Sequence, residues 1–218
     1  MPPKPKFTKE QILDAALDIA RTRGANAIVA REVGNRLGTS SSPIFTFWSN
    51  MDELIADVKT KAYEIFGQYL AVADEYVPAF KMRGMQFVKF ASEEPHLFRL
   101  LFIGTKTNND MSDIYDLLRY PQFEKDFEFI EKTYSLTHAE TEKVFNNTYI
   151  RAYAMCMLCA TGAYTYSQEQ CCTLLGECFE SITYAIKNNA LTYAGNMPAK
   201  TGTPESEQYL RAFNTERQ

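Results

Sequence analysis

The sequence of 218 residues predicts an all-α protein. Over long stretches, apolar residues recur every three or four positions, which is the spacing that lines one face of a helix. Glycine and proline, the residues that most often end helices, number only ten and nine. Three of these stretches begin with a capping box, in which a hydroxyl and a Glu or Gln three residues later satisfy free backbone N–H groups. The boxes start at Thr8, Thr137 and Ser167.

End signals divide the chain into helices. An N-cap side chain predicts where a helix begins, and a glycine or a polar segment predicts where it ends. Residues 105–110 are polar and predict a loop, and the polar segment from residue 195 predicts a partly disordered tail. The expected helices span residues 9–23, 30–37, 41–47, 50–72, 79–92, 95–104, 112–134 (with a break at Pro121), 139–162 and 168–188.

Residues 29–54 carry the most specific pattern of the chain. They predict two short helices around a tight turn at Gly38, followed by a new helix capped by Asn50. Two short helices joined in this way can place the second helix in the major groove of DNA. A plain hairpin within a helical core is the alternative. The second helix, however, presents Ser41, Ser42 and Thr46 opposite its apolar side, which favours DNA binding.

The candidate DNA contacts are of three kinds. Small polar or flat side chains suit base edges, and hydroxyl and ammonium groups suit phosphates. Arg31 is the strongest candidate, because a guanidinium can pair with guanine or with phosphate through two hydrogen bonds. The full set is Lys4, Lys6, Lys9, Arg31, Thr39, Ser40, Ser41, Ser42, Pro43, Phe45 and Thr46.

Charge is distributed unevenly along the chain. The net charge is −4, yet residues 1–48 hold seven basic against four acidic residues, and the remainder holds 16 against 23. A basic N-terminal segment on an acidic body suits a protein in which only that segment approaches phosphates.

Three patterns within residues 8–55 carry a resemblance to a known family. They are Ile12-Leu13-x-Ala15-Ala16-x-x-x-Ile19-Ala20, Arg31-Glu32-Val33-Gly34-x-x-Leu37-Gly38 and Ser40-x-x-x-Ile44-Phe45-x-x-Trp48-x-Asn50-x-x-Glu53-Leu54. They resemble the N-terminal domain of the TetR/AcrR family of transcriptional repressors. The resemblance implies a helix-turn-helix DNA-binding domain at 1–48, a helical ligand-binding and dimerisation domain at 49–194, and a polar tail at 195–218. The helix that starts at residue 50 would join the first two domains.

Three positions depart from the family pattern. Phe45 stands where the family usually has a tyrosine, and Met51 stands where it usually has a lysine. Both of the usual side chains reach phosphates, so the departures predict a weaker dependence of DNA affinity on salt. Ser42 occupies a position at which glycine is common.

The aromatic residues of the middle helices have two interpretations. They could be plain core, or some could line a pocket for a small apolar or amphipathic molecule, as the resemblance implies. Arg151 lies on a largely apolar helix and could bind an anionic ligand group or form an ion pair at the surface. The candidate ligand residues are Phe66, Phe87, Phe102, Tyr115 and Arg151.

The helices expected at 139–162 and 168–188 are the candidates for a homodimer interface. Two such helices from each subunit can form a four-helix bundle. A two-fold dimer would read a pseudo-palindromic operator in double-stranded DNA. The apolar faces are Phe145, Tyr149, Ala152, Cys156 and Cys159 on the first helix, and Cys171, Leu175, Cys178, Ile182, Ala185 and Ile186 on the second.

Other site chemistries lack a pattern in this sequence. It contains no Gly-rich phosphate loop, no nucleophile elbow and no paired carboxylates with an orienting partner, so no catalytic residue, metal or cofactor is expected. The cysteines are interpreted as buried thiols. A metal or redox sensor is the alternative, although neither histidine has ligand spacing to them. The five are Cys156, Cys159, Cys171, Cys172 and Cys178.

The sequence has no run of 18 apolar residues, and its first residues lack the apolar core of a secretory signal. A cytoplasmic protein with no membrane partner is therefore expected. Together these observations predict a DNA-binding transcriptional regulator, a repressor released from its operator by a small molecule. Two alternatives stay open: a DNA-binding regulator without a small-molecule effector, and a helical protein-interaction module.

Overall fold

The computed structural model of the protein describes residues 6–103, 121–191, 201–204 and 207. Within these ranges the secondary structure consists of helices and contains no strand, which confirms the all-α prediction. The chain divides into two compact units, Met1–Ile182 and Thr183–Gln218. None of the described helices has the length and apolar character needed to cross a bilayer. The loop expected at 105–110 lies outside the described residues, as does the first part of the helix expected from residue 112.

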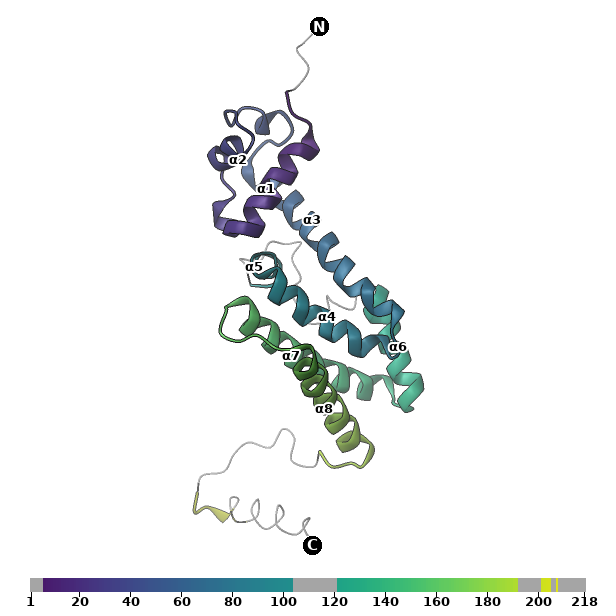
Figure 1. The fold of residues 1–218 in the computed structure, drawn as a ribbon. Coiled ribbons are helices and arrows are strands. Elements are labelled where there is room, and N and C mark those ends of the chain that lie inside the picture. The colour runs from purple at the N-terminus through teal and green to yellow at the C-terminus, as the bar shows by residue number, and fades with distance from the viewer. Residues whose placement is uncertain (1–5, 104–120, 192–200, 205–206, 208–218) are drawn as a thin grey trace. The chain divides into compact units, whose positions relative to one another are not determined.

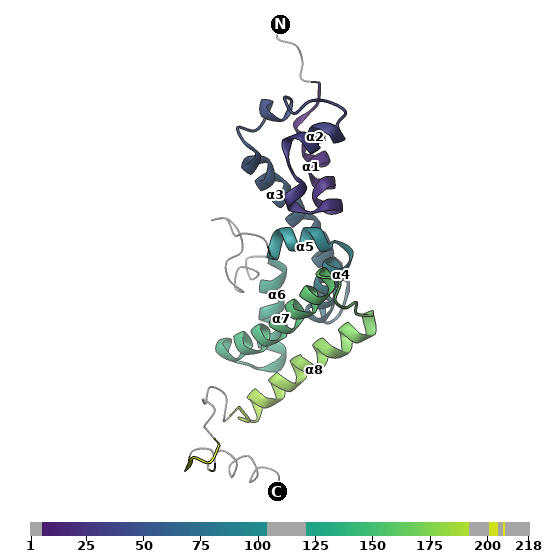
Figure 2. The same cartoon turned by 90° about the vertical axis from the view of Figure 1, so that its left-hand side faces the viewer.

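The first three α-helices agree with their predicted positions. They are α1 (Lys9–Arg23), α2 (Ala30–Arg36) and α3 (Met51–Ala71), and they lie together in Figures 1 and 2. The capping box of α1 is present: the Thr8 hydroxyl accepts from the N–H of Gln11, whose amide oxygen accepts from the N–H of Thr8. Their shared core contains Ile12, Ala16, Ile19, Val33, Ile44 and Leu54, all fully or almost fully buried.

Five more α-helices complete the described fold. They are α4 (Ala79–Glu93), α5 (Pro95–Phe102), α6 (Pro121–Tyr134), α7 (His138–Ala160) and α8 (Gln168–Lys187). Helix α4 contacts α3, α5, α6 and α7, so it is the central helix of this part of the fold (Figure 1). The predicted capping boxes before α7 and α8 are both present. Short 3₁₀ helices span Ala25–Ala27, Ile44–Thr46 and Val72–Glu75.

The helix expected over 41–47 is much shorter in the structure. Only Ile44–Thr46 forms a helix, of the 3₁₀ type, and turns precede it. The Ser40 hydroxyl accepts from the N–H of Ser42 at 3.4 Å, so a local side-chain bond competes with helical bonding in this hydroxyl-rich run. Pro43 adds no N–H donor. The prediction of a regular α-helix at this point is therefore wrong, although Ile44 is buried as expected.

Candidate DNA interface and aromatic pocket

The turn after α2 depends on a close backbone approach at Gly34. The N–H of Thr39 donates to the carbonyl of Gly34 at 3.0 Å. A Cβ added at Gly34 would lie 2.9 Å from the carbonyl carbon of Ser40 and 3.0 Å from the carbonyl oxygens of Thr39 and Ser40. Gly38 adopts φ +65°, a conformation that glycine reaches without steric cost. Gly34 thus permits the close approach of the Thr39 and Ser40 backbone to α2. Gly38 permits the turn that leads from α2 into residues 39–46.

The turn and the 3₁₀ helix present the predicted polar surface. Phe45 is 51% exposed, although Ile44 beside it is buried. Lys4 lies outside the described residues. Of the predicted DNA contacts, Lys6, Lys9, Arg31, Ser40, Ser42, Phe45 and Thr46 are exposed, and Thr39, Ser41 and Pro43 are half-buried.

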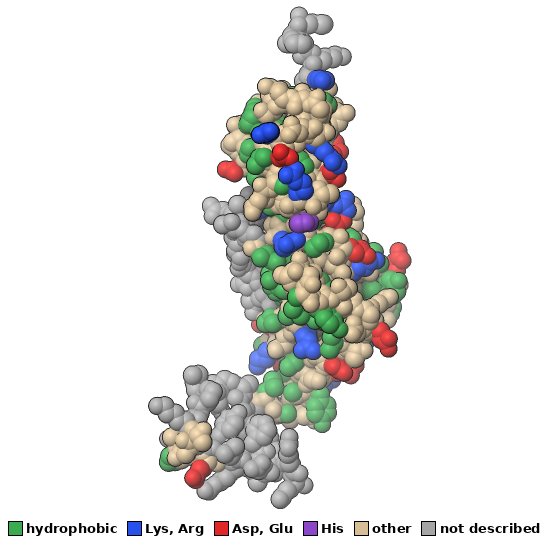
Figure 3. Space-filling model, turned by 60° about the vertical axis from the view of Figure 1, so that its left-hand side comes forward, with side chains coloured by type: hydrophobic (Ala, Val, Ile, Leu, Met, Phe, Trp, Pro, Cys, Tyr) green, Lys and Arg blue, Asp and Glu red, His purple; other side chains and the backbone are tan. Residues whose placement is uncertain are grey.

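Most other cations of the N-terminal helices are already paired. Arg23 pairs with Glu32, and Arg36 pairs with Asp18. Figure 3 shows blue basic side chains beside red acidic ones on one face of these helices. Arg31 is exposed and has no ion pair within the ranges that the structure describes. A guanidinium in this position keeps its donors available for a nucleic acid.

Lys9 takes part in a contact that the sequence analysis missed. Its ammonium lies 2.8 Å from the Asp57 carboxylate and 5.2 Å from the centre of the Trp48 ring. The Trp48 indole N–H donates to the same carboxylate at 2.8 Å. Residues 39–48, which hold most of the candidate DNA contacts, are called the recognition segment. The Trp48 cluster of Lys9, Trp48 and Asp57 connects the start of α1, the end of the recognition segment and the first half of α3. Lys9 therefore has a structural partner as well as an exposed position.

Acidification is expected to weaken the Trp48 cluster. The hydrogen bond from Lys9, assisted by that from Trp48, lowers the pKa of the Asp57 carboxyl in the folded protein, although partial burial opposes it. A carboxyl with a lowered folded pKa stabilises the fold above its unfolded pKa of about 3.9, and the contribution is lost as the pH falls through the folded value. The free energies of unfolding of the unsubstituted protein and of Asp57→Asn, measured with urea, should therefore differ most near neutral pH. The difference should begin to shrink only as the pH falls below about 4. A difference in stability that stays constant with pH would contradict this.

The N-terminal helices are fixed to the body by contacts between α1 and α5. The Arg21 Nε donates to the Glu94 carboxylate at 3.0 Å, and this hydrogen bond is the main reason why the pKa of Arg21 is raised. His96 lies so close to Gly24 that an added Cβ would be 3.2 Å from its Nδ1. Partial burial and the charge of Arg99 lower the pKa of His96. Helix α1 is also joined to α3, since the Lys61 ammonium of α3 lies 2.8 Å from the Asp14 carboxylate of α1.

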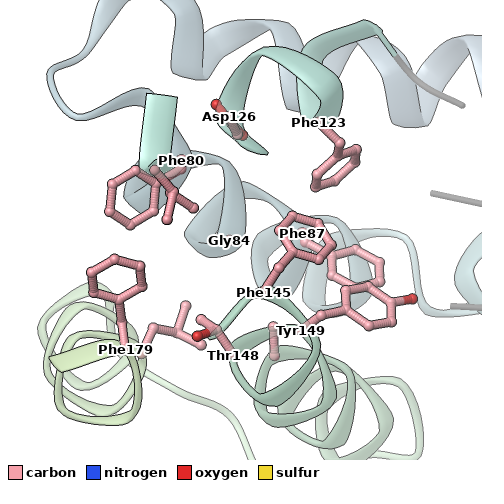
Figure 4. Close-up of a pocket in the computed structure, with 12 residues that line it drawn as sticks. Phe80, Gly84, Phe87, Phe123, Asp126, Phe145, Thr148, Tyr149 and Phe179 are labelled. Atoms are coloured by element: carbon pink, nitrogen blue, oxygen red, sulfur yellow. The ribbon is translucent and has the colours of Figure 1, made fainter. Parts of the chain in front are cut away.

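An apolar pocket lies among α4, α6, α7 and α8 (Figure 4). These helices, with α5, are called the body of the fold. It leaves about 60 Å³ in which the centres of water-sized molecules fit. Gly84 provides room for close packing of α4 on α8, because an added Cβ would lie 3.2 Å from Leu175 Cδ1. The lining residues are Phe80, Gly84, Phe87, Phe123, Asp126, Ile130, Phe145, Thr148, Tyr149, Ala152, Leu175 and Phe179.

No protein-family model matches this chain, and no curated protein sequence matches it either. Among solved structures it is similar to a TetR-like transcriptional regulator from Rhodococcus sp. RHA1, with a TM-score of 0.53 and 18% sequence identity. The match covers 83% of this chain and 95% of the other. The chain has a TetR-like fold. The similarity in fold therefore covers both the N-terminal helices and the helices that follow them, whereas the resemblance in sequence is confined to residues 8–55.

Within this TetR-like fold, the predicted ligand residues lie in different places. Phe87 lines the pocket. Phe66 and Phe102 pack against Phe87 in tilted and edge-on arrangements, and the three ring centres lie 5.3–5.5 Å from one another. Phe66 and Phe102 belong to the adjoining core and not to the pocket lining. Arg151 is exposed, and Tyr115 lies outside the described residues. The lining residues repeat at helical spacing, as Phe80, Gly84 and Phe87 do, but such a pattern alone does not distinguish a pocket from core.

A buried ion pair forms part of the pocket wall. Arg83 is 1% exposed and Asp126 is 4% exposed. The guanidinium donates to both carboxylate oxygens of Asp126, at 2.5 and 3.2 Å, to Asp74 at 2.9 Å and to the backbone carbonyl of Leu70 at 2.8 Å. Burial alone would lower the pKa of Arg83, but the hydrogen bonds and charges of Asp126 and Asp74 outweigh it and raise the pKa. Arg83 therefore stays charged and joins α4 to the end of α3 and to α6.

Three cysteines of the TetR-like fold, Cys156, Cys159 and Cys171, are buried and poorly placed for reactivity, whereas Cys172 and Cys178 are only half-buried, so the interpretation of all five as buried thiols is wrong for these two. Burial raises the pKa of Cys156 and Cys159 and raises that of Cys171 to about 11. These thiols stay protonated near neutral pH, whereas nucleophiles and metal ligands need the thiolate. Within the described ranges, no group of three or more His, Cys, Asp or Glu side chains is arranged to hold a metal ion.

Proposed function

We propose that this protein is a DNA-binding transcriptional regulator, and not an enzyme. The observation that carries the proposal is the set of exposed polar side chains Ser40, Ser42 and Thr46 in the turn and 3₁₀ helix that follow α2, with Arg31 exposed on α2. Phosphate contacts position such a unit, and base contacts give it specificity. In this proposal residues 1–48 bind DNA, residues 49–194 sense and dimerise, and residues 195–218 form a polar tail.

The active form in this proposal is a homodimer that reads a pseudo-palindromic operator and represses transcription. Helices α7 and α8 remain the proposed interface, but with a different face of α7. Phe145, Tyr149, Ala152 and Leu175 line the pocket, so they pack within one protomer. On α7 the exposed residues Ile150, Ala154 and Leu158 follow one another at a spacing of four, and Ile150 is 60% exposed. A stripe of this kind suits helix packing between two subunits.

Release by a small molecule is the regulatory part of the proposal. The pocket lies beside the Arg83–Asp126 pair, and Arg83 also holds the last turn of α3, whose first turn follows the recognition segment. A ligand that prefers one position of these helices would shift the dimer away from its DNA-binding form. A regulator with no small-molecule effector is the second candidate, because the pocket is small.

A mobility-shift assay with the DNA flanking the protein's own gene tests the DNA-binding part. The full chain should retard this DNA at low salt, and unrelated DNA of the same length and composition should require a higher protein concentration. If the chain retarded both DNAs at the same protein concentration, its DNA binding would be non-specific. A folded protein that retards neither would favour the helical interaction module.

Replacing Arg31 by alanine is expected to weaken operator binding by about 1–3 kcal/mol, or about 5–150-fold, if the guanidinium pairs with a base. The loss should be largest for the natural operator and small for unrelated DNA. If Arg31 instead binds a phosphate, both affinities should fall and the slope of log K against log salt should decrease by about one. Lys132→Ala is a matched control, because Lys132 is 77% exposed on α6, in the body. An unchanged operator affinity would remove Arg31 from the DNA-contacting set.

A further inference from the structure

We infer that the pocket among α4, α6, α7 and α8 takes a compact, uncharged aromatic molecule, and that it rejects ions of either sign. The sequence analysis expected a pocket for a small apolar or amphipathic molecule, but of its five candidate ligand residues only Phe87 lines the observed pocket. The regulatory meaning of this inference depends on the proposed function, but the binding itself does not require DNA.

Flat aromatic surfaces dominate the lining. The Phe87 and Tyr149 rings are nearly parallel, with an interplanar angle of 10° and a centre-to-centre distance of 5.8 Å. Phe145 is parallel to Tyr149 within 4° at 6.5 Å, and Phe80 lies 4.8 Å from Phe179. Figure 4 shows these labelled side chains converging on the pocket from α4, α7 and α8. Such surfaces favour a planar ring, which can stack on one wall and meet others edge-on.

The one charged side chain of the lining is already neutralised. Both oxygens of Asp126 accept hydrogen bonds from Arg83, so the carboxylate offers no free charge to a cation. The guanidinium of Arg83 is in turn engaged with Asp126, Asp74 and Leu70, so it offers little to an anion. An anion that entered would lose its hydration without gaining a partner, and a cation would gain only the attraction of the aromatic ring faces, which does not replace its hydration.

The remaining polar groups fit a ligand with at most one hydroxyl. The Thr148 hydroxyl donates to the Val144 carbonyl at 2.9 Å, which leaves its oxygen free to accept one hydrogen bond. Burial raises the pKa of Tyr149, so its phenol stays neutral. Because the centres of water-sized molecules fit in only about 60 Å³ of the pocket, a ligand with a single ring matches it better than a larger one.

The experiment compares three matched probes of one ring and one substituent carbon. Benzyl alcohol is neutral, benzoate is an anion and benzylammonium is a cation at neutral pH. Binding to the full chain without DNA is measured by ligand-observed NMR, which also detects weak complexes. Benzyl alcohol should bind saturably and at least tenfold more tightly than either ion. Equal or tighter binding of an ion overturns the inference, and so does the absence of binding by all three.

Two substitutions test the site and its charge balance. Ala152→Leu fills the pocket and should abolish benzyl alcohol binding, whereas Ala139→Leu, at an exposed position on the same helix, should not. Asp126→Asn removes the buried one of the two carboxylates that balance the charge of Arg83 and leaves only the half-exposed Asp74, so the ratio of benzoate to benzyl alcohol affinity should rise at least fivefold. Thermal unfolding establishes that each variant is folded. If Ala152→Leu does not fold, Thr148→Val replaces it, and this variant should weaken benzyl alcohol but not toluene. An unchanged affinity ratio in Asp126→Asn, or unchanged binding in the filled pocket, overturns the inference.

The same probes separate this inference from the proposed function. If benzyl alcohol binds but leaves the DNA complex intact, the pocket inference stands and regulation through this ligand class fails. If the chain retards its operator but binds none of the probes, DNA binding stands and the pocket inference fails.

Discussion

Replacing Arg83 by methionine is expected to lower the free energy of unfolding by about 3–5 kcal/mol, because the change leaves the buried Asp126 carboxylate without its partner. Both residues are almost fully buried, so water cannot take over the role of the guanidinium. The change also removes the donor to the Leu70 carbonyl. Urea unfolding, with the transition midpoint and slope measured for each variant, checks the magnitude.

A double substitution distinguishes loss of the partner from loss of packing. Arg83→Met combined with Asp126→Leu should be less destabilised than Arg83→Met alone, because an apolar pair avoids the buried lone charge. Lys132→Met provides a control for an exposed pair, since Lys132 lies 3.2 Å from Glu128 at the surface of α6, and its loss should cost at most about 1 kcal/mol. A cost for Arg83→Met no greater than for this control would contradict the argument.

Gly34→Ala is expected to disrupt DNA binding, although Gly34 is not itself among the candidate DNA contacts. The added methyl group would press on the backbone of Thr39 and Ser40, which no side-chain rotation can relieve. Overpacking of this kind costs about 1–3 kcal/mol in stability. Because the turn carries the whole recognition segment, operator affinity should fall by more than the loss of one base contact, which is about 1–3 kcal/mol.

Gly67→Ala is the matched control for this change. Gly67 also lies within a helix, α3, and a Cβ there meets nothing within 4 Å. Alanine at such a site should stabilise the helix by about 0.5–1 kcal/mol and leave operator affinity unchanged. Circular dichroism and mobility shifts on both variants check the pair of expectations. If Gly34→Ala binds operator as tightly as Gly67→Ala does, the close approach is not needed for recognition.

Local patterns predicted most of the described helices, because their information lies within a few residues. The capping boxes at Thr8 and Thr137 placed the starts of α1 and α7 correctly. The exception, residues 41–47, combines weak helix formers with side chains that bond to their own backbone. In this segment, hydrogen bonds from side chains to the backbone compete with helical hydrogen bonds and determine the backbone conformation. The spacing of apolar residues alone therefore predicts a longer helix than the structure contains.

The pocket and the Trp48 cluster were beyond local patterns, because their parts come from helices far apart in the sequence. Arg83 and Asp126 are 43 residues apart, and nothing in either segment indicates that they meet. An arginine between Phe80 and Phe87 on one helix was the available hint that a buried partner exists. For the DNA-contacting surface, by contrast, the candidates lie within one short segment, so the sequence alone could propose them.

The hydrogen bond from Arg83 to the last turn of α3 has a mechanical consequence. Helix α3 is unbroken over 21 residues, which corresponds to a rod of about 30 Å. Its far end is tied to the recognition segment by the cap at Asn50 and by the Trp48 cluster. A tilt of about 5° about the Leu70 end would displace that far end by about 3 Å, comparable to the rise of one base pair, about 3.4 Å. In the proposed regulator, α3 would thus act as one arm that pivots at the pocket wall, so that a small rotation there becomes a displacement of the recognition segment.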